Sequence, residues 1–410
     1  FHADFVSGHI DLAEKTGAKI VYGPKAEAEY EIYVGQDGET FPLGDVSFEL
    51  LHTPGHTLES SCLLLKDKNG KDHAVFTGDT LFVGDVGRPD LAVSSEVSRE
   101  DLASLLYDSL RQKLMKLNDE VIVYPGHGPG SACGKSIGNE TQSTIGEQKQ
   151  SNYALRDISK EQFIQELNEG LMPPPKYFFK DAVINRKGYE SYDTIMEKNV
   201  TPLTAEETKK QKESGALVLD TRHHQTFNDG FIPGSLNIGL DGGFAVWVGT
   251  LVEDIEQPIV IVVEKGREQE AVKRLSRVGY DNVIGYLDGG VQTWKENIGP
   301  LDSITSISPE DLENTYKNDP EINILDVRKP GEYSNGHISN ANSFPLDYIR
   351  ENINELDKNK KYYLHCKAGY RSMAAGSLLK ANGFQNIIDI GGGFDAIKKT
   401  GIKVTEPELA

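Results

Sequence analysis

Short apolar runs alternate with glycine-containing turns through the first 150 residues. Apolar runs of this length, bounded by turn residues, predict β-strands. Histidines and aspartates directly follow several of these runs, and the rigid end of a strand is a suitable position for a metal ligand. The runs are Lys19–Tyr22, Val46–Leu51, Ser61–Leu65, Ala74–Phe76 and Val121–Tyr124.

The next stretch is more polar. Residues 140–185 have helical spacing through Glu161–Leu167 and are interrupted at Pro173–Pro175. Residues 191–202 are predicted to form a linker.

The rest of the chain contains an internal repeat. Val218–Arg222 matches Ile324–Arg328, and Gly230–Ile232 matches Gly336–Ile338, both at an offset of 106 residues. Each copy predicts strand, helix, strand, helix, which indicates a small parallel α/β sheet. We therefore predict an α/β multidomain chain with domains at residues 1–190, 203–300 and 305–408.

Composition narrows the classes of function. Lys and Arg number 43 against 63 Asp and Glu, for a net charge of -20, which argues against a nucleic-acid partner because such partners need a basic surface. No apolar run approaches the roughly 20 residues of a membrane span. The three cysteines, Cys62, Cys133 and Cys366, do not form a disulfide framework, and we expect a reducing cytoplasm. Because the chain starts with Phe1, we expect that an N-terminal piece is missing.

Cys366 lies between a predicted strand, Tyr362–His365, and a helix that begins at Ser372. Backbone N–H groups at the start of a helix, the helix dipole, and the positive charges of Lys367 and Arg371 all favour a thiolate, which is the nucleophilic form. The same N–H groups suit the anionic outer sulfur of a persulfide. A buried structural cysteine is the alternative, but the loop context favours a catalytic one.

This segment resembles the rhodanese family of sulfurtransferases. Its loop has the length found in sulfur-handling members, so the resemblance implies a catalytic loop formed by Cys366, Lys367, Ala368, Gly369, Tyr370 and Arg371. Asp326 and Arg328 are expected to support the fold.

The first copy of the repeat departs from this pattern. Alignment of Gly266 with Gly369 places Val263 at the position of Cys366 and Glu268 at that of Arg371. Valine is no nucleophile, and glutamate repels an anionic persulfide. We expect this copy to serve packing, assembly or domain placement, with substrate docking as an alternative.

Four loops of the first domain carry residues that can bind a metal. They are Phe1–Phe5, Thr53–Thr57, Phe76–Thr80 and Tyr124–Gly128, and the last three place a glycine beside His56, Asp79 and His127. Neutral imidazoles with a carboxylate are typical of zinc or non-haem iron sites. Any one of these histidines alone is more simply a structural residue, but four such loops in series indicate a metal site.

The series resembles the metallo-β-lactamase superfamily, which implies an αββα sandwich, here truncated at its N-terminus. The superfamily signature is His-x-His-x-Asp-His followed by later His, Asp and His residues. Its first His would directly precede Phe1, and its last His is Phe5 here. Because a phenyl ring cannot bind metal, a two-metal hydrolytic site is disfavoured.

Within the superfamily, the resemblance points to the persulfide dioxygenases. It implies one Fe(II) per subunit, held by His56, Asp79 and the histidine expected just before Phe1. His2, Asp4 and His127 are then expected to surround the ligands. Arg88 is expected to bind the carboxylate or phosphate of the substrate's thiol carrier, and a surface ion pair is the alternative for it.

The order of domains resembles the CstB-type persulfide dioxygenase–sulfurtransferase fusions of Gram-positive bacteria. The resemblance implies oxidation of a low-molecular-weight thiol persulfide by O₂ to sulfite, followed by sulfur transfer through Cys366 to give thiosulfate. We expect no nucleic-acid or membrane partner. We do expect a homo-oligomer, either a dimer or a tetramer. The alternative is a thioester hydrolase of the glyoxalase II type fused to a sulfurtransferase.

Overall fold

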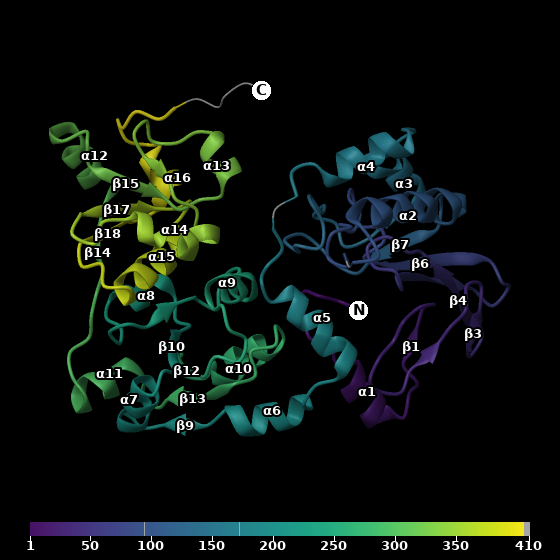
Figure 1. Cartoon of the computed structure of the whole chain (residues 1–410), viewed down its shortest axis with the longest axis horizontal. Helices are drawn as coiled ribbons and strands as arrows, with labels where there is room; N and C mark the ends of the chain where they lie inside the picture. The colour runs from purple at the N-terminus through teal and green to yellow at the C-terminus, as the bar shows by residue number, and fades with distance from the viewer. Residues whose placement is uncertain (94, 172, 406–410) are drawn as a thin grey trace. The chain divides into compact units, whose positions relative to one another are not determined.

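The protein is described from a computed structural model (Figure 1). The structure describes residues 1–93, 95–171 and 173–405, so residues 406–408 of the last predicted domain lie outside it. The chain divides into two compact units, Phe1–Tyr192 and Asp193–Ala410. Each unit is described by itself.

The first unit is built on a six-stranded sheet with the strand order β3-β4-β5-β6-β7-β8. All neighbours are antiparallel except β6 and β7, which are parallel. Four of the predicted apolar runs form strands of this sheet, whereas the run Lys19–Tyr22 gives only the short β1, which pairs with β2. The strands are β1 (Val21–Tyr22), β2 (Tyr33–Val34), β3 (Thr40–Leu43), β4 (Val46–His52), β5 (Ser61–Lys66), β6 (Asp72–Gly78), β7 (Ile122–Pro125) and β8 (Ser143–Thr144).

Helices α2 and α4 pack against this sheet. Leu106 and Leu110 of α2 and Phe163 of α4 share one buried core with Val75 and Val123 of the sheet. The predicted helical spacing at Glu161–Leu167 is confirmed by α4. The helices of this unit are α1 (His9–Thr16), α2 (Arg99–Gln112), α3 (Ile145–Ser151), α4 (Lys160–Asn168) and α5 (Phe178–Lys187), with short 3₁₀ turns at Leu114–Lys116 and Tyr153–Leu155.

The segment predicted as a linker, residues 191–202, is not irregular. It contains helix α6 (Tyr192–Asn199) and reaches strand β9 (Pro202–Leu203), which forms an edge of the next sheet. Ile195 is buried, and the buried Asn199 donates a hydrogen bond to Asp281 O at 2.6 Å. These tertiary contacts order a segment whose sequence carries no strong periodicity.

The second unit contains two five-stranded sheets, in which all pairs are parallel. Their orders are β11-β10-β12-β13-β9 and β16-β15-β17-β18-β14. The two sheets therefore have the same topology. The central strands β12 and β17 are buried throughout, as expected for parallel strands covered on both faces.

The elements of the first repeat are β9, α7 (Ala205–Glu213), β10 (Leu217–Asp220), α8 (His224–Asn228), β11 (Leu236–Asn237), α9 (Phe244–Leu251), β12 (Ile259–Val262), α10 (Glu268–Ser276), β13 (Val283–Leu287) and α11 (Gly290–Asn297). Those of the second repeat are β14 (Thr305–Ile307), α12 (Pro309–Asn318), β15 (Asn323–Asp326), α13 (Pro330–Ser334), β16 (Asn342–Ser343), α14 (Ile349–Asn352), β17 (Tyr362–His365), α15 (Tyr370–Ala381), β18 (Ile387–Ile390) and α16 (Gly393–Ile397), with 3₁₀ turns at Leu346–Tyr348 and Ile353–Glu355.

A buried ion pair lies at the end of the second strand of each repeat. Arg222 donates to the Asp220 carboxylate at 2.6 Å, and Arg328 donates to the Asp326 carboxylate at 2.5 Å. In each repeat the same guanidinium also donates to a glycine carbonyl eight residues further along. Such fully bonded buried pairs fix the loop after the strand. The repeated contacts confirm the internal repeat and the α/β multidomain fold.

Candidate functional site

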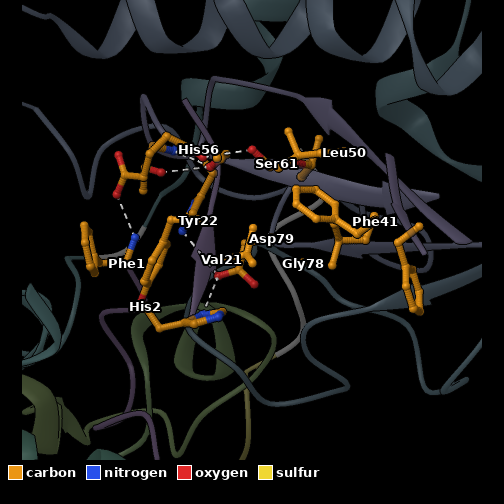
Figure 2. Close-up of a pocket in the computed structure, with 17 residues that line it drawn as sticks. Phe1, His2, Val21, Tyr22, Phe41, Leu50, His56, Ser61, Gly78 and Asp79 are labelled. Atoms are coloured by element: carbon orange, nitrogen blue, oxygen red, sulfur yellow. Dashed lines mark hydrogen bonds and ion pairs between the residues drawn. The ribbon is translucent and has the colours of Figure 1, made fainter. Parts of the chain in front are cut away.

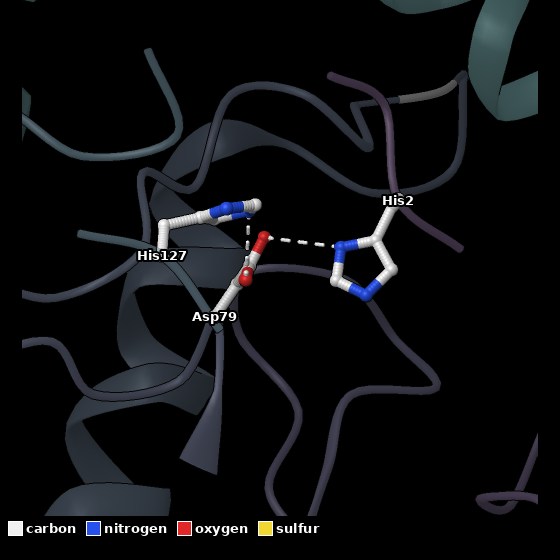
Figure 3. Close-up of side chains that lie close together, drawn as sticks. All are labelled: His2, Asp79 and His127. Carbon is white, nitrogen blue, oxygen red and sulfur yellow. Dashed lines mark ion pairs between the residues drawn. The ribbon is translucent and has the colours of Figure 1, made fainter. Parts of the chain in front are cut away.

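Asp79 lies directly after strand β6, and three histidines surround its carboxylate. His56 Nε2 and His127 Nε2 each lie 3.3 Å from a carboxylate oxygen, and His2 Nδ1 lies 3.7 Å away. Figure 3 shows His2 and His127 pointing at Asp79 from two sides. The structure thus brings together predicted site residues from four separate loops.

The surroundings of Asp79 are those of a cation site. Neither of its buried carboxylate oxygens has a hydrogen-bond partner within the described residues. Burial raises the pKa of Asp79, but the three histidines outweigh burial and hold the pKa well below its usual range. Buried, charged and unsatisfied oxygens carry a large free-energy cost, which a bound metal ion removes. Two imidazole nitrogens with one carboxylate are a donor set suited to zinc or non-haem iron.

His56 is held in a fixed orientation. Its Nδ1 lies 2.8 Å from the backbone carbonyl of Arg88, which places the proton on Nδ1 and leaves Nε2, on the Asp79 side, as an acceptor. A bond of this kind to the distal ring nitrogen is how proteins orient metal-binding histidines.

Two glycines lie so close to the site that no side chain fits. A Cβ at Gly126 would lie 2.6 Å from Asp79 Oδ1, and one at Gly87 would lie 1.9 Å from Asp79 O. The glycine beside His127 therefore permits close approach of the backbone to Asp79.

Cys133 also lies in this cluster, whereas its sequence context favours a packing role and leaves a place at the mouth of the site as the alternative. Its thiol is close enough to share one ion with His56 and Asp79, or with Asp4 and His127. It is fully buried, and burial together with the Asp79 and Asp4 carboxylates raises the pKa of its thiol. Burial and these two carboxylates therefore favour the protonated form of the Cys133 thiol.

Asp4 and His127 form the other side of the cluster, 3.2 Å apart. Burial raises the pKa of Asp4. For His127, burial lowers the pKa, but Asp79 and Asp4 outweigh it and raise the pKa above its usual value. The ring of Phe5 stacks on His2 at 4.8 Å between centroids, so an aromatic contact occupies the position where the superfamily signature has a histidine.

Arg88 is buried and engaged. Only 4% of it is exposed, and its guanidinium donates to both oxygens of Asp90, at 2.6 and 2.7 Å, and to Ala132 O at 3.2 Å. The ion pair considered for Arg88 therefore exists, but it is buried rather than on the surface. Binding of a substrate anion by this side chain would require the pair with Asp90 to open.

A cavity of about 350 Å³ opens beside the cluster (Figure 2). His2, His56 and Asp79 form its polar part. Its apolar part is formed by Phe41, Phe48, Leu50 and Leu63. Such a cavity offers a small molecule an apolar wall and a reactive end.

Cys366 lies at the end of strand β17, in the second unit. Gly369 N–H donates to its sulfur at 3.1 Å, and the Cys366 carbonyl accepts from Phe394 N at 2.7 Å. Gly369 has φ +110°, a conformation that side chains rarely adopt. The loop is therefore fixed so that a backbone donor faces the sulfur.

The other loop residues differ in exposure. Lys367 and Ala368 are exposed, whereas Arg371 is half-buried and forms a two-point ion pair with Glu332, at 2.5 and 2.9 Å. Burial raises the pKa of Glu332, but Arg371 outweighs burial and lowers it. Glu332 was not expected from the sequence.

Tyr370 connects the loop to the first repeat. Its hydroxyl donates to Gly239 O at 2.8 Å, and its ring lies against Gly242, where a Cβ would be 2.9 Å from the ring. His224 Nε2 lies 3.0 Å from where a Cβ of Gly369 would be. The repeat without a cysteine thus forms one wall of the Cys366 loop.

In the equivalent loop of the first repeat, side chains of the loop itself occupy the cysteine position and bond the backbone donor. Val263 is buried at the cysteine position, and Gly266 N–H donates to the Glu268 carboxylate at 3.0 Å. The donor that faces sulfur in the second repeat is therefore already bonded in the first.

Models of two known families match separate parts of this chain. The model of the metallo-beta-lactamase superfamily matches residues 1–127, and that of the rhodanese-like domain matches residues 204–297 and 308–400. Hydroxyacylglutathione hydrolase GloC of Haemophilus influenzae is 36% identical over 127 residues, 31% of this chain and 49% of that protein. The chain spans about half the length of the curated hydrolases it matches.

Two solved structures are also similar. A metallo-beta-lactamase from Staphylococcus aureus is 30% identical with a TM-score of 0.60, and the match covers 70% of this chain and 81% of that one. ETHE1 from Myxococcus xanthus is 34% identical with a TM-score of 0.38, over 45% of this chain and 72% of that one. The chain belongs to the metallo-β-lactamase superfamily and carries two rhodanese domains after its metallo-β-lactamase domain.

None of the helices that the structure describes is long and apolar enough to cross a membrane.

Proposed function

We propose that the first unit oxidises the outer sulfur of a low-molecular-weight thiol persulfide with O₂, and that Cys366 transfers sulfur to the resulting sulfite. The observation that carries this proposal is the convergence of His56 and Asp79 on one site, in a chain that also holds a Cys366 thiol beneath a backbone donor. A metal site for sulfur oxidation and a cysteine for sulfur transfer in one chain suit two consecutive reactions, oxidation to sulfite and then transfer of sulfur to that sulfite.

The residues of the first unit would bind one iron. His56 and Asp79 would hold it, together with the histidine that the superfamily signature places before Phe1. Bound Fe(II) would supply the redox chemistry with O₂. Arg88 O fixes the ring of His56, and the apolar part of the cavity would contact the apolar part of the thiol carrier.

The reaction balances without another oxidant. A persulfide RSSH, O₂ and water give the thiol RSH, sulfite and two protons. A second persulfide passes its outer sulfur to the Cys366 thiolate and leaves as RSH. Sulfite then attacks that outer sulfur, the S–S bond breaks, and thiosulfate leaves while the thiolate is restored. Gly369 N–H donates to Cys366 Sγ, which carries the negative charge of the restored thiolate.

Product analysis tests the proposal. Iron-loaded protein given a defined persulfide and O₂ should consume O₂ and form thiosulfate. Cys366→Ser should form sulfite and lower the rate of sulfur transfer by about three orders of magnitude. Cys62→Ala, which removes a buried thiol of strand β5, should leave the transfer rate unchanged. Absence of O₂ uptake by protein that contains iron would contradict the proposal.

A thioester hydrolase is the second candidate. The cluster of Asp4, His127 and Cys133 offers donors for a further ion beside Asp79, and relatives of this domain are named hydroxyacylglutathione hydrolases. Metal analysis separates the two candidates. Two bound ions per chain, with thioester hydrolysis and no O₂ uptake, would favour the hydrolase.

A further inference from the structure

The loop of residues 2–7 carries two side chains of the metal cluster but has no regular structure. His2 faces Asp79, and Asp4 faces His127. In the described part of the chain, residues 2–7 form no backbone–backbone hydrogen bond. Backbone groups that are removed from water need partners, so side chains must hold this loop.

Asn185 of helix α5 supplies these partners. Its amide nitrogen donates to His2 O at 2.9 Å and to Phe5 O at 2.7 Å. Its amide oxygen accepts from Ser7 N at 2.8 Å. Both N–H groups and the oxygen are thus bonded to one loop, and the side chain is 1% exposed.

Residues around Asn185 strengthen the attachment. The hydroxyl of Tyr30 donates to the backbone carbonyl of Asn185 at 2.6 Å, and Tyr177 donates to Asp4 O at 3.3 Å. Figure 1 shows the N-terminal segment beside α5. Helix α5 follows the segment that the superfamily model matches, which ends at residue 127. Asn185 therefore lies outside the matched segment, whereas the loop that it holds lies inside it.

We propose that Asn185 is a positioning residue of the metal centre. It holds the backbone of residues 2–7 so that His2 and Asp4 face Asp79 and His127. The inference rests on the proposed function only in that the cluster binds a metal ion. Partners of this kind, which hold the residues around a metal, typically contribute about 10- to 100-fold in metal affinity.

Two variants of Asn185 test the proposal. Asn185→Asp keeps the shape of the side chain but replaces the donors with an oxygen that repels both carbonyls. Asn185→Leu removes all three hydrogen bonds without adding charge. Affinity for Fe(II) under anaerobic conditions, and for Co(II), is measured by competition with a chromophoric chelator. We expect both variants to bind about 10- to 100-fold more weakly than the unaltered chain.

A matched control uses another buried asparagine. Asn199, also 1% exposed, donates to Asp281 O in the second unit, so Asn199→Asp should leave metal affinity unchanged. Unchanged affinity in both Asn185 variants would overturn the proposal. Weaker binding by Asn185→Asp alone would also overturn it, because the added charge would then be the cause.

Hydrogen exchange gives a readout without metal. In the metal-free protein, the amide of Ser7 should exchange faster in Asn185→Leu, which removes its acceptor, than in Asn199→Asp. Equal exchange would overturn the proposal. If the unaltered chain bound no metal, the proposed function would fail, and the role of Asn185 at a metal centre would fail with it. Faster exchange would then show only that Asn185 orders the loop.

Discussion

Single residues of the two candidate sites are held by backbone groups. Arg88 O fixes the ring of His56, and Gly369 N–H fixes the sulfur of Cys366. Backbone groups do not change with a substitution, so these contacts persist unless the loop moves. Side chains whose protonation differs between the folded and unfolded states are a separate source of sensitivity.

His224 is such a residue. Burial lowers the pKa of its ring from 6.5 to about 4, and the neighbouring His223 adds to the shift. His224 is therefore protonated below about pH 6.5 in the unfolded chain, but only below about pH 4 in the folded protein. The contribution to stability is fully present above the unfolded pKa and is lost as the pH falls from there toward the folded pKa.

We predict that His224→Gln loses less stability on acidification than the unaltered chain. Urea unfolding at neutral pH and at about pH 5 measures the loss in each protein. Gln225→Ala, a change at the neighbouring exposed and non-titratable residue, is the control and should lose as much stability on acidification as the unaltered chain does. An equal loss in His224→Gln and the unaltered chain would show that His224 does not titrate in this way.

At the scale of elements, helix α15 is the clearest example of tertiary burial. Ser372–Leu379 is buried throughout. The buried Ser377 hydroxyl accepts a hydrogen bond from Asn237 N, in strand β11 of the first repeat, at 2.9 Å. A helix with no exposed stripe needs cover on several faces, and the first repeat supplies one of them. The first repeat, which has Val263 at the cysteine position, therefore has a structural role in covering helix α15.

Tyr370→Phe tests this role. The change removes the hydrogen bond to Gly239 O, which is worth about 1 kcal/mol. Gly369 N, next to Tyr370, should then hold the Cys366 sulfur less firmly, and alkylation of Cys366 at neutral pH should slow about three- to fivefold. Mass spectrometry of iodoacetamide-treated protein gives the rate.

Tyr280→Phe is the matched control for this change. The Tyr280 hydroxyl is also buried and donates to Val252 O at 2.7 Å, but it lies away from the Cys366 loop. Its loss should lower stability by a similar amount and leave alkylation unchanged. If both variants slowed alkylation equally, general loosening rather than Tyr370 would be the cause.

At the scale of the whole molecule, the chain joins two units with different chemistry. A covalent connection keeps Cys366 within the length of the connection from the first unit, whereas Cys366 of another chain at micromolar concentration lies farther away on average. Sulfite released by the proposed oxidation should therefore meet Cys366 of the same chain more often than that of another chain.

Mixing two variants tests the connection. Asp79→Asn alters the proposed oxidation site, and Cys366→Ser removes the nucleophile of the proposed transfer site. An equimolar mixture at micromolar concentration should form thiosulfate several-fold more slowly than the unaltered chain, and the deficit should shrink as protein concentration rises. Equal rates at every dilution would show that sulfite exchanges freely and that the connection has no kinetic effect.

The sequence determined the α/β fold class, the repeat, the Cys366 loop and the loops that carry His56 and Asp79. These are local patterns, in which a few adjacent residues set both the strand and the loop after it. The tertiary structure alone decided the positions of Cys133, Glu332 and Asn185. Asn185 contacts backbone groups 180 and 183 residues away, and no local pattern records a partner that distant.

The same reasoning applies to Arg88 and to the segment 191–202. The sequence left two roles open for Arg88, binding of a substrate anion and a surface ion pair, and only packing decided that its guanidinium lies against the half-buried Asp90. No helical periodicity predicts helix α6 (Tyr192–Asn199), and burial of Ile195 and Asn199 orders this helix. Local sequence predicts the structure of a strand and of the loop that follows it. Contacts between distant segments depend on how the whole chain packs.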